Sequence, residues 1–521
     1  MIRPVEFRSR GTMARSKNVL FILADQWRAD CLSALGHPVV RTPNLDALAA
    51  DGVLFRRHYA QTSPCGPSRA SILTGLYAHT HRSVRNGIPL DARFTNLALE
   101  MRRAGFDPAL IGYTDTSADP RGRPADDPAL FTYESVMPGF TPALRLPEDP
   151  AAWLAHLRQL GYDVPPHGWD GAARPIENYP DAAARGPTYA PARYKAEHSD
   201  TAFVADAALE YLETQRSRSW FLHLVFLRPH PPWIAPEPYN RLYEPSSTPR
   251  FRRAADAALE SRAHPYLAWL LAQQQHVAGM PDAHLRQVRA TYWGLIAEVD
   301  HHVGRLIAWL KENGQYDETL IIFSCDHGEM LGDHWLLGKD GFYDQTYHIP
   351  LIVRLPGGVA GRSVDEFSES VDLVPTMCTA LDLPVPAQCV GRSLLPWLVG
   401  ATPSRWRQEV FFEYDFRDVP GAAPERALGL DLDQCCLAVI RDRRFKYVHF
   451  AALPPLFFDL DGDPDELANR ANDKDCTARV LEYAQRMLSW RLETAERTLT
   501  GVQLTSAGPV HRRNASRRTG D

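Results

Sequence analysis

The chain contains few cysteines, and they form no pattern typical of a metal site or a disulfide framework. Eight cysteines are spread irregularly through 521 residues, and none form a Cys-x-x-Cys pair. Neither a zinc ribbon nor a disulfide-linked secreted fold is therefore indicated. We expect a protein of the reducing cytoplasm.

Long apolar runs and charge of one sign are also scarce. No segment approaches the run of about eighteen apolar residues that a membrane span needs, and the run at 19–24 ends in Asp25-Gln26. The formal net charge is only −6 and no long block of like charge occurs, so we expect neither a membrane nor nucleic acid as a partner. Hydrophobic residues make up 45% of the chain, which is enough to bury one large core and a smaller one.

Apolar runs and helical patterns alternate along the chain. Strands are predicted for five apolar runs, at 18–24, 108–112, 220–226, 319–324 and 349–354. Helices are predicted at 42–50, 68–76, 97–104, 201–214 and, most clearly, 285–312. This alternation predicts an α/β fold with a largely parallel sheet. We expect the pair His301-His302 of the last helix to lie on the solvated surface.

Two proline-rich segments, at 114–200 and 228–283, interrupt the alternation and are typical of functional loops. A strand–turn–strand pattern at 439–448 and a helix near 477–495 then predict a small α+β domain with a short antiparallel sheet. The predicted organisation is a disordered extension at 1–16, a large α/β domain at 17–385, the small domain at 386–500 and an arginine-rich tail at 501–521.

Cys65 lies in the run Cys65-Gly66-Pro67-Ser68-Arg69, immediately before a predicted helix. It would therefore lie near the positive N-terminal end of that helix, which favours an anionic substrate. Arg69 follows one turn later, where a guanidinium can bind an oxyanion. Asn86, before Gly87, can add a neutral donor or can simply form a turn.

Two further motifs follow predicted strands. Asp25-Gln26 ends the first strand, and Asp326-His327-Gly328 follows the strand at 319–324. Open α/β sheets place their sites at such ends, and these side chains are natural ligands of a divalent ion. Each motif alone would more commonly be a plain turn, but together they predict one metal site, with Lys339 close by in the sequence.

His230 lies between prolines in Arg228-Pro229-His230-Pro231-Pro232, after the strand at 220–226. The prolines restrict this loop, so the imidazole would be held rigidly at a strand end. A histidine there suits proton donation to a leaving group near neutral pH. A structural histidine in a proline turn is the alternative.

Together these residues resemble formylglycine-dependent sulfatases of the alkaline phosphatase superfamily. The resemblance extends from about residue 17 to 500 and rests on the motifs at 25–30, 42–46, 65–69, 326–329 and 456–460. Within that family the chain is most similar to bacterial phosphonate monoester hydrolases, which also cleave phosphodiesters. That likeness rests on the runs at 109–114, 228–232, 413–418 and 446–459.

The resemblance implies an alkaline-phosphatase-like α/β/α sandwich with a large mixed, mostly parallel sheet. It also implies that a formylglycine-generating enzyme oxidises Cys65 to an aldehyde, whose hydrate supplies the nucleophile. One manganese or calcium ion would bind Asp25, Gln26, Asp326, His327 and the modified residue 65. A homodimer or homotetramer, with the tail at an interface, is expected.

The resemblance further implies that Arg69 and Asn86 support the nucleophile and the transferring group. Tyr113, His230 and Lys339 would line the substrate side. Two positions depart from the family pattern. Asp115 stands where a substrate-facing threonine is expected, and His348 stands where relatives tend to carry arginine.

The predicted function is hydrolysis of phosphonate monoesters and phosphodiesters, with promiscuity toward sulfate esters. An aryl or choline sulfatase is the nearest alternative, since such enzymes share the Cys-x-Pro-Ser-Arg run. A noncatalytic ligand-binding relative, in which Cys65 stays a thiol, is the remaining one. Rates on a panel of ester substrates distinguish the phosphorus-ester hydrolase from the sulfatase. The intact mass of the protein tests the noncatalytic alternative, because it shows whether Cys65 is still a thiol.

Overall fold

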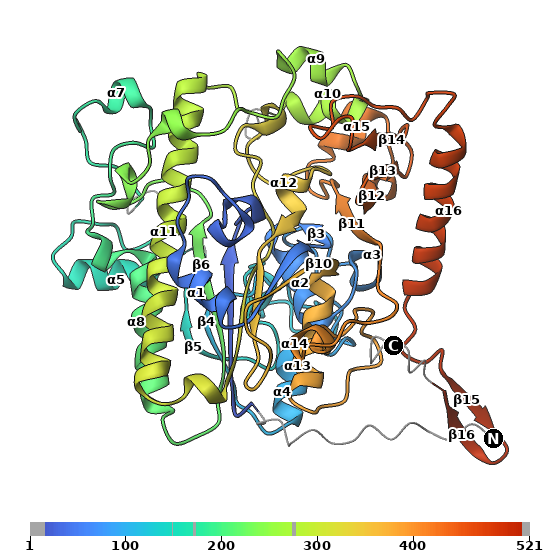
Figure 1. The fold of residues 1–521 in the computed structure, drawn as a ribbon, viewed down its shortest axis with the longest axis horizontal. Coiled ribbons are helices and arrows are strands. Elements are labelled where there is room, and N and C mark those ends of the chain that lie inside the picture. Colours follow the sequence, from blue (N-terminus) through green and yellow to red (C-terminus); the bar gives the residue numbers. More distant parts are fainter. Residues whose placement is uncertain (1–15, 148, 170–172, 274–277, 513–521) are drawn as a thin grey trace.

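The computed structural model describes residues 16–147, 149–169, 173–273 and 278–512 of the chain. Within them lie a large sheet with helices on both faces and a smaller sheet at its side (Figure 1). The predicted extension at 1–16, apart from Ser16, and the tail beyond residue 512 lie outside the described residues. Among the described residues, no helix is long and apolar enough to cross a membrane.

Nine strands form the large sheet, in the spatial order β10 (Arg362–Glu369), β2 (Val53–Tyr59), β9 (Leu351–Arg354), β7 (Thr319–Cys325), β1 (Asn18–Asp25), β6 (Phe221–Pro229), β4 (Pro108–Gly112) and β5 (Thr141–Arg145), with β8 (His348–Ile349) beside β2. β1 pairs in parallel with β6 and β7, and β4 pairs in parallel with β5 and β6. β8 and β9 run antiparallel to their neighbours. The sheet is thus mixed and mostly parallel, which confirms the prediction.

Helices cover both faces of this sheet (Figure 1). One core contains residues of α1 (Pro43–Ala50), α8 (Asp200–Thr214) and α11 (Asp282–Glu312), and the other contains residues of α2 (Cys65–Thr74), α4 (Leu97–Arg103) and α13 (Leu373–Ala380). Along β1, Leu20 and Ile22 belong to the first core, whereas Phe21 and Leu23 belong to the second. Successive strand side chains point to opposite faces, so β1 is buried on both.

Shorter helices lie in the connections. They are α3 (Ala78–His81), α5 (Ala151–Gln159), α7 (Ala182–Arg185), α9 (Ala257–Ser261), α10 (Pro265–Leu271), α12 (Asp344–Tyr347), α14 (Leu395–Leu398) and α15 (Ala423–Leu428). Four of them, α5, α7, α9 and α10, fall in the two segments predicted to be irregular loops.

Two predictions need correction. The strand predicted at 349–354 is divided, because Pro350 has no N–H to donate and separates β8 from β9. The histidine pair of α11 is also not wholly solvated. His301 is exposed, but His302 is 4% exposed and its Nδ1 lies 3.0 Å from Arg305 Nη1. Because α11 packs against α8 as well as the sheet, its buried stripe is wider than its apolar residues indicate.

The smaller sheet has the order β14 (Leu456–Asp459), β13 (Phe445–Phe450), β12 (Cys436–Asp442), β11 (Glu409–Asp415) and β3 (Thr62–Ser63). Its four C-terminal strands are antiparallel, as predicted, whereas β3 runs parallel to β11. The helix α16 (Thr477–Thr494) lies along its outer side, where Trp490 stacks on Phe411 with ring centroids 4.6 Å apart (Figure 1). Beyond it, β15 (Val502–Thr505) and β16 (Gly508–His511) form a hairpin that projects from the body (Figure 1).

Candidate active site

Several of the predicted site residues meet where parallel strands of the large sheet end. They are Asp25 at the end of β1, Asp326 and His327 after β7, His230 after β6 and Tyr113 after β4. β1 runs parallel to β6 and β7, and β4 runs parallel to β6, so the carboxyl ends of these strands lie at one edge of the sheet. This edge is where open α/β sheets form their sites.

Cys65 is the first residue of α2 and faces this edge. Its Sγ lies 3.3 Å from His327 Nε2, 2.9 Å from Lys339 Nζ and 3.9 Å from Asp25 Oδ1. The residue is only 6% exposed, and burial, together with Asp25, raises the pKa of the thiol well above its ordinary value. Burial thus disfavours the thiolate form of an unmodified Cys65, although the residue lies at a helix N-terminus.

Arg69, one turn further along α2, connects the carboxyl groups of the site. Its Nη2 donates to Asp25 Oδ2 at 2.8 Å, and its Nε donates to Asp326 Oδ2 at 3.1 Å. Asp115 Oδ2 lies 3.6 Å from the same Nε. The guanidinium also lies over the ring of Tyr113, 4.1 Å from its centroid, and is 1% exposed. Arg69 therefore fixes the two carboxylates that the sequence predicted as metal ligands.

The carboxyl groups of the site do not have ordinary pKa values. Burial raises the pKa of Asp326 to about 6, and the neighbouring Asp25 adds to this effect. Burial also raises the pKa of Asp115 to about 8, although Arg69 opposes it. For Asp25, burial would raise the pKa, but His230, Lys339 and Arg69 lower it and together hold it below the usual range. Such crowding of carboxyl groups favours binding of a further cation.

The arrangement fits a divalent metal ion. The ligand atoms of Asp25, Cys65, Asp326 and His327 all lie within 4.8 Å of one another, and all four residues are buried. Two carboxylates and an imidazole form a donor set for ions such as Mn²⁺. His327 Nδ1 lies 3.0 Å from Gly328 O, so the ring donates there and turns Nε2 toward the cluster.

Gln26 is held by two residues to which sequence reasoning gave no role. Its backbone has a φ of 68°, and Tyr292 of α11 donates a hydrogen bond to its carbonyl at 2.7 Å. Its amide nitrogen donates to Glu329, which leaves Oε1 2.9 Å from Lys339 Nζ. The sequence offered one signal for Glu329, its place directly after Asp326-His327-Gly328, and none for Tyr292 beyond its place in a long helix.

Asn86 and Tyr113 contact neighbours of the reacting position. Asn86 Oδ1 accepts a hydrogen bond from Gly66 N at 2.9 Å, directly after Cys65, while the residue itself stays exposed. Tyr113 donates from its hydroxyl to Asp25 Oδ2 at 2.7 Å. Both residues thus position parts of the site, and Asn86 borders its open side.

His230 and Lys339 lie at the solvent side of the cluster, where both are half-buried. His230 Nδ1 lies 2.6 Å from Pro231 O, so in the neutral ring Nδ1 carries the proton and Nε2 has a lone pair. Burial and the nearby Lys339 lower the pKa of His230 to about 4. The contacts of His348 are with β2 and not with these residues. Its ring stacks on that of Tyr59, with the ring centroids 5.0 Å apart.

Comparisons with known proteins agree with this geometry. The sulfatase family model matches residues 17–383, and the model described as N-sulphoglucosamine sulphohydrolase, C-terminal, matches residues 332–493. The multifunctional alkaline phosphatase superfamily protein PehA of Trinickia caryophylli is 43% identical over 509 residues, which cover 94% of this chain and 98% of that protein.

Two solved structures are also similar over almost the full length. The phosphonate monoester hydrolase of Agrobacterium radiobacter is 47% identical with a TM-score of 0.89, and the alignment covers 95% of this chain and 100% of that one. The phosphonate monoester hydrolase of Silicibacter pomeroyi is 42% identical with a TM-score of 0.88, covering 96% and 99%. With the residues of the site in place, these matches show that the chain belongs to the sulfatase family of the alkaline phosphatase superfamily.

Proposed function

We propose that the chain is a metal-dependent hydrolase of phosphonate monoesters and phosphodiesters that also accepts sulfate esters. The observation that carries this proposal is the position of Cys65, at the N-terminus of α2 and inside the cluster of Asp25, Asp326 and His327. The similarity to two phosphonate monoester hydrolases at 42% and 47% identity supports the substrate class.

The nucleophile would be formylglycine made from Cys65. Burial raises the pKa of the Cys65 thiol and so disfavours the thiolate, which is the nucleophilic form of an unmodified cysteine. An aldehyde at residue 65 hydrates to a gem-diol with two hydroxyls, one to attack and one to collapse the adduct. Because Cys65 is 6% exposed in the folded chain, a formylglycine-generating enzyme would need to reach it before folding is complete.

Asp25, Gln26, Asp326, His327 and residue 65 would hold one manganese or calcium ion. Such an ion would lower the pKa of the diol and neutralise charge on the nonbridging oxygens of the substrate. Arg69 orients two of these carboxylates and adds its own positive charge.

In the first step one hydroxyl of residue 65 loses its proton to solvent, its oxygen attacks phosphorus, and the bond from phosphorus to the ester oxygen breaks on the opposite side. Lys339 gives a proton to the departing oxygen. His230 can do so only in its protonated form, which its lowered pKa of about 4 makes scarce near neutral pH. In the second step a base takes the proton of the remaining hydroxyl of residue 65. Its carbonyl re-forms, the bond from residue 65 to the phosphoryl oxygen breaks, and the phosphonate or phosphate leaves.

The test uses enzyme whose intact mass shows formylglycine, loaded with manganese or calcium. Rates are measured on a phosphonate monoester, a phosphodiester and a sulfate ester with the same para-nitrophenyl leaving group. We expect the two phosphorus esters to be cleaved faster than the sulfate. Cys65→Ala should lower kcat by at least about 10³-fold. Near-normal turnover of this variant would exclude the covalent step, and a thiol mass from the native host would support the noncatalytic alternative.

An aryl or choline sulfatase is the second candidate function, and the same panel decides it. Faster cleavage of the sulfate than of both phosphorus esters would favour it. This candidate is supported by matches to an arylsulfatase of Clostridium perfringens and a choline-sulfatase of Rhizobium meliloti, which are 27% and 26% identical to this chain. Both identities are well below those of the phosphonate monoester hydrolases.

We also propose a cytoplasmic homodimer or homotetramer. All eight cysteines lie in the described part of the chain and are unpaired, which suits a reducing compartment. The hairpin exposes Leu504 (80%) and Val510 (53%), and α16 exposes Leu488 and Leu492. Apolar residues grouped in this way suit a subunit interface. A monomer mass in analytical ultracentrifugation would contradict the oligomer.

A further inference from the structure

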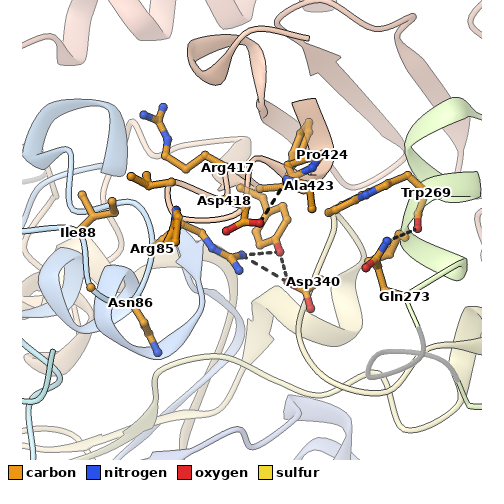
Figure 2. A pocket seen from close by; sticks show the side chains of 16 residues that line it. Arg85, Asn86, Ile88, Trp269, Gln273, Asp340, Arg417, Asp418, Ala423 and Pro424 are labelled. Carbon is orange, nitrogen blue, oxygen red and sulfur yellow. Dashed lines mark hydrogen bonds and ion pairs between the residues drawn. The ribbon is translucent and has the colours of Figure 1, made fainter. Parts of the chain in front are cut away.

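A cavity of about 500 Å³ is lined by the side chains that Figure 2 shows. We call it the Tyr414 pocket; its lining includes Arg85, Asn86, Trp269, Asp340, Tyr414 and Phe416. Two of these residues adjoin the reacting position. Asn86 accepts the hydrogen bond of Gly66, and Asp340 directly follows Lys339, whose Nζ lies 2.9 Å from Cys65 Sγ.

The pocket has aromatic walls. Tyr414 and Phe416 are each 2% exposed, and Trp269 of α10 is half-buried with its ring centroid 5.8 Å from that of Phe416. Both Tyr414 and Phe416 belong to the run 413–418, which the catalytic cluster itself does not use. Trp269 is the ring among these three that exposes an appreciable part of its surface, and a flat aromatic ring stacks favourably on another flat ring.

The charged groups of the pocket are paired within the protein. Arg85 Nη1 donates to the Tyr414 hydroxyl at 2.8 Å and lies 3.6 Å from Asp340 Oδ1, and the same hydroxyl donates to Asp340. Arg417 Nε donates to Asp415 at 2.8 Å, and its guanidinium points away from the other labelled side chains (Figure 2).

Asp418, also in the lining, accepts hydrogen bonds from the backbone N–H groups of Gly421 and Ala423. With each charge engaged in this way, the pocket suits an uncharged ligand better than a second anion or a cation.

The position of the pocket indicates which of the two organic groups of the substrate it would bind. In an in-line displacement the leaving group departs opposite the nucleophile. The lining of the Tyr414 pocket meets the surroundings of the nucleophile at Asn86, which accepts the hydrogen bond of Gly66, whereas neither His230 nor Lys339, the candidate proton donors to the leaving group, is part of that lining. The pocket therefore lies to the side of the line of attack.

We propose that the Tyr414 pocket binds the organic group that stays on phosphorus, and that it prefers a flat, uncharged ring. This inference rests on the proposed function. A phosphonate monoester or a phosphodiester carries such a group in addition to its leaving group. A sulfate ester or a phosphate monoester does not, because only oxygens remain there. The pocket thus favours the phosphorus esters with two organic groups.

The experiment compares three substrates with the same para-nitrophenyl leaving group: bis(para-nitrophenyl) phosphate, methyl para-nitrophenyl phosphate and para-nitrophenyl sulfate. Trp269→Ala removes one wall, and Ala423→Leu fills the pocket from α15. We expect each to lower kcat/KM on the diaryl ester about tenfold and on the other two less than about twofold. Phe131→Ala, a matched aromatic control with 77% exposure, should leave all three unchanged.

If both variants lose kcat/KM equally on the two diesters, or lose none, the pocket assignment is wrong and the proposed function stays intact. Wild-type enzyme that cleaves neither diester would instead overturn the proposed function, and the pocket assignment with it. Thermal unfolding of each variant checks folding. The two variants change the pocket in opposite ways, so a folding defect in one leaves the other as the test.

Discussion

Two clusters of charged side chains in the described part of the chain differ in how their charges balance. In the active site, Asp25, Asp115 and Asp326 share the space with Arg69 and Lys339. The second group, which we call the Lys446 cluster, joins the small sheet to α12 and consists of Asp344, Arg441, Lys446 and Glu466.

The Lys446 cluster is closed by ion pairs. Lys446 is fully buried, and its Nζ lies 2.6 Å from Asp344 Oδ1 and pairs with Glu466. Arg441 Nη2 lies 3.0 Å from Asp344 Oδ2. Burial would raise the pKa of Asp344, but Arg441 and Lys446 outweigh it and hold that pKa below its usual range. Two cations thus balance two carboxylates, as in a structural network.

The active site lacks this balance. Its three carboxyl groups crowd around Arg69, and burial raises the pKa of Asp326 to about 6 and that of Asp115 to about 8. The protein therefore does not stabilise all three groups as carboxylates, and their ionised forms are costly unless a further cation binds. Buried charge alone does not mark a functional site in this protein. What marks it is a group of carboxyls whose ionised forms the protein does not fully stabilise.

Metal removal should give the largest difference between the two clusters. We expect chelation to abolish turnover and to lower the unfolding temperature, because Asp25 and Asp326 would then repel each other without a bound ion. An ion at a hundredfold excess over its Kd contributes about 2.7 kcal/mol to stability. Calorimetry measures the unfolding temperature with and without chelator, and metal analysis confirms that the ion has been removed. The Lys446→Met variant should show the same decrease in unfolding temperature on chelation. An unfolding temperature that does not respond to chelation would contradict a metal at Asp25 and Asp326.

The same substitution at the two lysines should separate the clusters. Lys446→Met leaves the buried Glu466 without its cation and Asp344 with Arg441 alone, so we expect a loss of about 3–5 kcal/mol in stability. Lys339→Met should lower kcat about 10²-fold, because it removes the proton donor that we propose for the leaving group. Its effect on stability should be smaller, since Lys339 is half-buried and a metal can compensate.

Denaturant unfolding and kcat measurements on both variants, each with metal, test this pair. A Lys446→Met enzyme as stable as the wild type would show that the Lys446 cluster is not structural. A Lys339→Met enzyme with full kcat would remove Lys339 from the proton-transfer step and leave His230 as the candidate.

A smaller effect is expected for Asp115 and concerns pH. Its carboxyl group has a pKa of about 8, so it is neutral below that pH and negative above it. Ionisation 3.6 Å from Arg69 would weaken binding of an anionic ester, so wild-type kcat/KM should fall as the pH rises through 8. Asp115→Asn should keep its activity there, a gain of about threefold to tenfold at alkaline pH. Asp126→Asn, at an exposed position, is the control, and identical pH profiles would exclude Asp115 as the cause.

Many strands and helices can be predicted from the pattern of apolar residues within one segment, but some elements cannot. β1 and α11 were predicted because a continuous apolar run and an apolar stripe are visible within one segment. β2 was not predicted, since Arg56 and Arg57 interrupt its apolar residues. The hairpin of β15 and β16 was missed as well, because its strands are short and largely exposed. Such elements depend on partners that the local sequence does not reveal.

The sequence by itself determined the chemistry that is available. It placed Asp25-Gln26 and Asp326-His327 at the ends of buried strands and Cys65 and Arg69 at the start of a helix, because strand and helix periods and side-chain chemistry are local properties. Only the tertiary structure decided how these groups are oriented and what surrounds them. Tyr292 lies 266 residues from Gln26, and the walls of the Tyr414 pocket come from distant segments. The physical reason is that such contacts arise from packing of the whole chain, which no single segment encodes.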